Sequence, residues 1–134
     1  MYYLDTNTCI YFLNGTYASI RTKLLSVSPG EISIPVIVKA ELLHGAYKST
    51  NRKSNLEKLE RFLEAFEIAS FEDPMTYEYA SIRSATEAQG QPIGPNDLFI
   101  AAIVRFHEGI LVTNNIKEFG RIENLRTENW VIES

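Results

Sequence analysis

Short apolar runs alternate along the chain with longer segments whose apolar residues recur at helical spacing. The runs that predict strands lie at residues 2–4, 31–34, 67–71, 110–113 and 130–132. Residues 110–112 are apolar without a break, which is typical of a strand buried on both faces. The alternation predicts an α/β fold with a central parallel sheet of about four to five strands and helices on both faces.

The intervening segments carry the start and stop signals of helices. Helices are predicted at residues 9–13 (with caps at 5–8), 18–27, 35–47, 56–66, 73–89 and 96–108. Pro35 suits the first turn of the third helix, and Asp73 suits the cap of the fifth. Gly15, Gly90 and Gly109 end the first, fifth and sixth helices.

Acidic and polar residues follow the predicted strands, where an open α/β sheet binds its ligands. Asp5 directly follows the first strand, and Thr113 ends the fourth. Glu41 lies inside the helix after the second strand, and Asp97 begins the helix before the fourth. Asp5 and Asp97 could each serve only as a helix cap. Glu41 lies among apolar neighbours, so it either faces solvent or points into a site, where burial would require a metal or an arginine.

Composition places the chain among globular proteins and excludes some classes of binding partner. With 134 residues, 45% of them hydrophobic, we expect a single domain spanning residues 1–134. The net charge of −4 argues against a protein that coats DNA or a polybasic membrane binder. Cys9 is the one cysteine, so no intrachain disulfide forms. Without a signal peptide or a membrane-spanning run, we expect a cytoplasmic protein with no membrane association.

Several common sites are absent from the sequence. The seven glycines form neither a dinucleotide fingerprint nor a P-loop. His44 and His107 lack the spacing of zinc ligands, and Cys9 lacks the arginine of a cysteine phosphatase loop. The acidic residues therefore remain the candidates for a functional site.

Four segments, in order and over almost the whole chain, resemble the motifs of the PIN-domain ribonucleases, and among them the VapC-type toxins of toxin–antitoxin pairs. They are residues 3–7 with Asp5, 34–45 with Glu41, 94–102 with Asp97, and 111–119. Many family members carry an aspartate where this chain has Asn115. Glu118, one helical turn later, could replace the missing charge.

The resemblance implies an endoribonuclease that uses Mg²⁺, or Mn²⁺, to hydrolyse RNA phosphodiester bonds, with transfer RNA as one suggested substrate. It implies that Asp5, Glu41 and Asp97 hold the metal, while Thr113 and Asn115 position a water or the scissile phosphate. Asn7 would support Asp5 through a hydrogen bond. The chemistry is coherent because clustered carboxylates repel one another and a hard divalent cation removes the conflict.

The resemblance also implies a homodimer and a small antitoxin whose C-terminal segment covers the site. Residues 39–61 contain six basic and three acidic side chains. Lys48, Arg52 and Lys53 are candidate contacts to RNA phosphates, unless they are simply a solvated helix end.

Two alternatives stay open at this point. The first is a catalytically weak PIN module that only binds RNA or a partner, an interpretation favoured by the uncharged Asn115. The second is an aspartate-based phosphotransferase, which also carries an aspartate after its first strand. It would need a lysine near the last strands, and Lys117 is poorly placed for that role.

Overall fold

A five-stranded, all-parallel sheet forms the centre of the computed structural model, which describes residues 1–133. Its strands are β1 (Tyr2–Leu4), β2 (Ile32–Pro35), β3 (Glu67–Ala69), β4 (Ile110–Val112) and β5 (Arg126–Glu128), in the order β3-β2-β1-β4-β5. The predicted α/β class is confirmed. No helix within residues 1–133 has the length and apolar character needed to cross a membrane.

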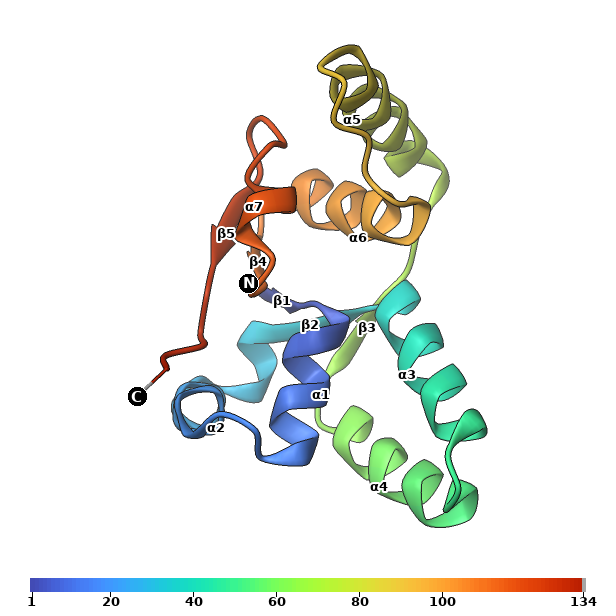
Figure 1. Ribbon diagram of the computed structural model, residues 1–134, viewed down its shortest axis with the longest axis vertical. Coiled ribbons are helices and arrows are strands. Elements are labelled where there is room, and N and C mark those ends of the chain that lie inside the picture. The colour runs from blue at the N-terminus through green and yellow to red at the C-terminus, as the bar shows by residue number, and fades with distance from the viewer. Residues whose placement is uncertain (134) are drawn as a thin grey trace.

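Helices cover both faces of the sheet (Figure 1). They are α1 (Thr6–Asn14), α2 (Ala18–Ser26), α3 (Val36–Lys48), α4 (Arg52–Glu64), α5 (Thr76–Ala88), α6 (Pro95–Phe106) and α7 (Ile116–Phe119). Helices α1, α2 and α4 lie on one side of the sheet, and α5 and α6 lie on the other. Two short 3₁₀ turns, Pro29–Glu31 and Asp73–Met75, precede β2 and α5.

The direction of winding reverses between β1 and β4. From β1 the chain moves outward through β2 to β3, then returns across the sheet and adds β4 on the other side of β1. The carboxyl ends of β1 and β4 lie together, with Leu4 paired to Val112. Such a reversal opens the crevice in which α/β folds bind ligands. The residues that follow Leu4 and Val112 therefore face the crevice together.

The core explains why these strands are central. Leu4, Ile34, Leu111 and Val112 are fully buried. Helix α6 contributes a continuous row of five buried residues, Ile100 to Val104. Burial of this apolar surface on both faces of the sheet is the main stabilising term. It gives the polar residues at the strand ends a rigid support.

Some predicted boundaries are wrong. The last strand is Arg126–Glu128, not residues 130–132, because Trp130 leaves the sheet and packs edge-on against Tyr2. Asp73 begins a 3₁₀ turn and does not cap α5, which starts at Thr76. Pro35 is the last residue of β2 and the N-cap of α3, so it precedes the first helical turn.

Candidate active site

Asp5 lies directly after β1, and its side chain is almost completely buried, with 6% of the residue exposed. It is the N-cap of α1: Oδ1 accepts a hydrogen bond of 2.8 Å from the backbone N–H of Thr8. Burial raises the pKa of Asp5, hydrogen bonding by Thr113 and Thr8 lowers it, and the charge of Glu41 raises it further. The capping hydrogen bond therefore occupies one oxygen of Asp5. Capping does not explain why the carboxylate of Asp5 lies close to that of Glu41.

Glu41 lies in the second turn of α3 and is held from two sides. The Thr6 hydroxyl donates to its Oε1 at 2.5 Å, and Asn96 Nδ2 donates to its Oε2 at 3.5 Å. Thr6 begins α1 and Asn96 lies in the first turn of α6, so Glu41 joins three helices. The role of Thr6 and Asn96 was not foreseen from the sequence, although both lie inside motif segments. Glu41 thus points toward the first turns of α1 and α6.

Asp97 occupies the first turn of α6 but makes no capping hydrogen bond; Gly94 holds the cap position. Its pKa is raised to about 7, first by burial, then by Glu118, with smaller contributions from Glu41 and Asp5. Asp97 therefore faces the other three carboxylates, and the interpretation of Asp97 as a simple helix cap is wrong.

The loop after β4 supplies the remaining polar groups. Thr113 is completely buried, and its Oγ1 accepts a hydrogen bond of 2.9 Å from the backbone N–H of Asn115. Asn115 is the N-cap of α7, with Oδ1 accepting from the N–H of Glu118 at 3.4 Å. Its Nδ2 donates to Glu118 Oε2 at 3.0 Å. Asn115 and Glu118 are thus in direct contact beside Asp97.

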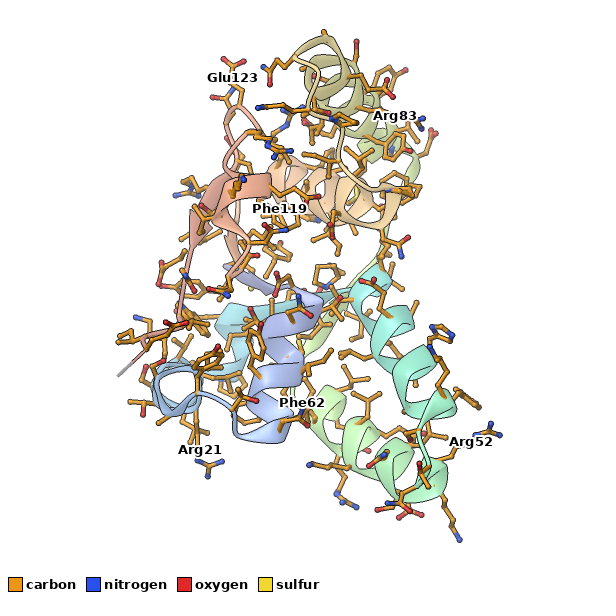
Figure 2. The ribbon with its side chains drawn as sticks, viewed as in Figure 1. Arg21, Arg52, Phe62, Arg83, Phe119 and Glu123 are labelled. Atoms are coloured by element: carbon orange, nitrogen blue, oxygen red, sulfur yellow. The ribbon has the colours of Figure 1, made fainter. Side chains whose placement is uncertain are left out.

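Other predicted residues lie outside this cluster. Asn7 is exposed, and within residues 1–133 it forms no hydrogen bond to Asp5. The carboxylate of Asp5 accepts hydrogen bonds from Thr8 and Thr113 instead. Lys48, Arg52 and Lys53 lie where α3 turns into α4, and Figure 2 shows Arg52 at the far end of this hairpin from α6. Arg52 Nε donates to the Tyr47 carbonyl at 2.9 Å. The three basic residues remain predicted RNA contacts, placed at a distance from the carboxylates.

The carboxylates suit a divalent metal ion. Asp5, Glu41, Asp97 and Glu118 offer oxygen donors alone, and no lysine or arginine within residues 1–133 pairs with them. Burial raises the pKa of Asp97 most, and the neighbouring Glu118, Glu41 and Asp5 raise it further. No three His, Cys, Asp or Glu side chains in the described part of the chain are grouped to hold a metal alone. The carboxylate oxygens are the donor type that Mg²⁺ prefers, and Mg²⁺ in proteins commonly keeps several waters between itself and the side chains.

Comparisons with known proteins place the chain in a family. Residues 2–125 match the PIN domain family. The chain is 44% identical over 131 residues to "Ribonuclease VapC2" of Rickettsia felis, covering 97% of this chain and 98% of the relative. It is 35% identical to the "tRNA(fMet)-specific endonuclease VapC" of Shigella flexneri, covering 95% and 96% of the two chains. The solved structure of VapBC2 from Rickettsia felis, bound to a promoter DNA fragment, superposes with a TM-score of 0.90 at 42% identity, covering 96% of this chain and 98% of that one.

Proposed function

This chain belongs to the PIN-domain family, and we propose that it is a toxin endoribonuclease that hydrolyses RNA phosphodiester bonds with Mg²⁺ or Mn²⁺. The observation that carries the proposal is that four carboxylates lie close enough to act on one another near the carboxyl ends of β1 and β4, without a cationic partner in residues 1–133. The names of the VapC relatives, a ribonuclease and an endonuclease, support the same activity. Nothing in the site favours the phosphotransferase alternative, since Lys117 is exposed on α7.

Asp5, Glu41 and Asp97 would hold the metal, in part through water molecules that complete its shell. When bound, the metal polarises a phosphate and lowers the pKa of a nearby water. The protein contributes fixed orientation: Thr6 and Asn96 hold Glu41, and the Thr8 N–H holds one oxygen of Asp5. Thr113, buried beside Asp5, stabilises its ionised form. Each metal-binding carboxylate except Asp97 therefore has a neutral donor that leaves its charge intact.

The partners follow from the relatives. VapBC2 of Rickettsia felis carries the name of the VapBC family, which is a family of toxin–antitoxin systems. We infer that an antitoxin binds this chain too and blocks the acidic site, and that the toxin forms a homodimer. The substrate is RNA, and the Shigella flexneri relative, specific for tRNA(fMet), makes transfer RNA the first substrate to test. Lys48, Arg52 and Lys53 would contact RNA phosphates away from the cleaved bond.

RNA cleavage by the purified toxin tests the proposal. We expect wild-type protein to cut transfer RNA with Mg²⁺ or Mn²⁺ and to stop on addition of EDTA. Asp5→Ala and Asp97→Asn should each lower the rate by roughly a hundredfold or more. Glu87→Gln, which breaks only the exposed ion pair with Arg83, is the matched control and should cleave normally.

Two results would change the conclusion. Cleavage that survives both chelation and the two substitutions would reject the metal mechanism. Tight RNA binding without cleavage at any metal concentration would favour the alternative of a catalytically weak binding module. Addition of a cognate antitoxin should suppress the wild-type activity, and its failure to bind would remove the toxin role without affecting the nuclease role.

A further inference from the structure

We propose that Asn115 is a positioning residue: its side-chain amide fixes the carboxylate of Glu118 beside Asp97 and thereby brings the fourth carboxylate into the site. Asn115 itself then touches neither metal nor RNA. The inference rests on the proposed metal-dependent function. It answers a question that the sequence leaves open, namely how a site with an uncharged residue at this place obtains its fourth negative charge.

Both polar atoms of the Asn115 side chain are turned toward Glu118. Nδ2 donates to Glu118 Oε2 at 3.0 Å, and Oδ1 accepts from the Glu118 backbone N–H at 3.4 Å. An amide has one acceptor and one donor group, so this geometry uses each of them on the same neighbour. Both polar atoms of the side chain are therefore oriented by Glu118.

Asn115 is in turn anchored to the sheet. Its backbone N–H donates at 2.9 Å to the hydroxyl of Thr113, which is completely buried at the end of β4. Thr113 also lies beside Asp5 and lowers its pKa through hydrogen bonding. One connected path thus runs from Asp5 through Thr113 and Asn115 to Glu118, which lies next to Asp97.

The chemistry explains why an amide serves here. Helix α7 has only four residues, and Glu118 is partly exposed, so an unheld glutamate would sample several rotamers. An aspartate at position 115 could still cap α7 but would have no hydrogen to donate, and its charge would repel Glu118. Asn115 caps the helix and fixes the carboxylate without adding charge.

A double-mutant cycle on Mn²⁺ affinity, measured by isothermal titration of the full chain, tests the inference. We expect Asn115→Ala to weaken Mn²⁺ binding about tenfold, as losses of groups that orient metal-binding side chains do. Glu118→Gln should weaken binding by a similar or larger factor. The double variant should bind no more weakly than Glu118→Gln alone, because Asn115 acts through Glu118. Additive losses would mean that Asn115 meets the metal itself and would overturn the inference.

Two further variants separate positioning from folding. Asn115→Asp keeps the cap of α7 but removes the donor, so we expect weaker Mn²⁺ binding with an unchanged circular dichroism spectrum; binding as tight as wild type or tighter would contradict the inference. Asn114→Ala removes a neighbouring asparagine whose Oδ1 accepts from Asn129 instead, and should bind Mn²⁺ within twofold of wild type.

The outcomes distinguish this inference from the proposed function. If wild-type protein neither binds Mn²⁺ nor cleaves RNA in a metal-dependent way, the proposed function fails and the inference fails with it. If wild type does both while Asn115→Ala matches it in Mn²⁺ affinity, only the inference fails.

Discussion

The hydroxyl of Thr6 donates a hydrogen bond of 2.5 Å to Oε1 of Glu41, across 35 positions of the sequence. The bond ties the start of α1, one residue after Asp5, to the second turn of α3. It therefore fixes the distance between the two carboxylates that follow β1 and β2. A threonine hydroxyl can do this without neutralising either charge, which a lysine or arginine would do.

Replacing Thr6 with valine should loosen Glu41 while preserving the shape of the side chain. We expect Mn²⁺ affinity to fall about tenfold and RNA cleavage to fall with it, since the group lost only orients a metal-binding carboxylate. Thr50→Val, at the exposed turn between α3 and α4, is the control and should leave the affinity unchanged. Unchanged Mn²⁺ binding in Thr6→Val would show that Glu41 needs no support.

Neutralising Asp97 should stabilise the metal-free protein above neutral pH. The pKa of Asp97 is raised to about 7 in the folded chain, whereas an unfolded aspartate titrates near 4, so its ionised form opposes folding. The penalty grows from about pH 4 to about pH 7 and is constant above that. With EDTA present at pH 8, we expect Asp97→Asn to unfold at a higher temperature than wild type. Its free energy of unfolding should be larger by about 1–3 kcal/mol, after allowance for the partial exposure of Asp97.

The same comparison at pH 4 provides the check. There the folded Asp97 is protonated and the unfolded one is about half protonated, so the difference between the two melting temperatures should be much smaller than at pH 8. A gain in stability that is equal at pH 4 and pH 8 would mean that it has a cause other than the charge of Asp97.

Metal binding should itself depend on pH through Asp97. Because a proton must leave the carboxyl group with a pKa of about 7 before a cation can use it, Mn²⁺ affinity should rise by up to about tenfold between pH 6 and pH 8 and level off above pH 8. Titration calorimetry in two buffers of different ionisation enthalpy would count the released proton. Affinity that is flat from pH 6 to pH 8 would contradict the assignment of Asp97 to the metal.

The basic residues at the α3–α4 turn should affect RNA binding but not cleavage chemistry. We expect the triple variant K48Q/R52Q/K53Q to weaken RNA binding and to lower the salt dependence of log Kd by about 2, as expected for three lost phosphate contacts on single-stranded RNA. The catalytic rate at saturating RNA should be preserved. Arg83→Gln, on α5, is the control for charge alone (Figure 2). A salt dependence equal to that of wild type would show that RNA does not touch this turn.

Gly109 should tolerate no side chain, for a reason unrelated to backbone conformation. A Cβ at this position would overlap the ring of Tyr3 and approach the Met1 carbonyl to 3.2 Å. Tyr3 is buried in β1 and stacks on His107, so its ring cannot move away freely. We expect Gly109→Ala to cost about 1–3 kcal/mol in chemical denaturation. Gly30→Ala, where a Cβ would meet nothing within 4 Å, is the control.

The central strands were predictable because each is a short apolar run buried on both faces. The edge strand β5 was not, since Arg126–Glu128 is polar and partly exposed and gives no periodic signal. Trp130 was assigned to a strand because it is apolar, yet its burial comes from packing on Tyr2, and its indole N–H donates to Glu128. Apolar character predicts that a residue is buried more reliably than it predicts whether that residue lies in a strand, a helix or a loop.

The acidic residues of the site were predictable from their place after or beside the strands. Their supporting donors were not, because Thr6 and Asn96 meet Glu41 from 35 and 55 positions away. Asn115 gave a local signal, a capping residue three positions before an acidic one, but its spacing from Glu118 fits a capping role equally well. Only the orientation of its amide in three dimensions identifies the partner.

The strand order also sets the point during synthesis at which the carboxylates of the site can come together. β1 is made first but is flanked by β4, whose residues emerge more than 100 positions later, and Glu118 follows that strand. A growing chain therefore lacks a complete set of carboxylates until Glu118, more than 100 positions after Asp5, has been synthesised. The topology therefore delays assembly of the carboxylate cluster until β4 has paired with β1 and α7 has followed it.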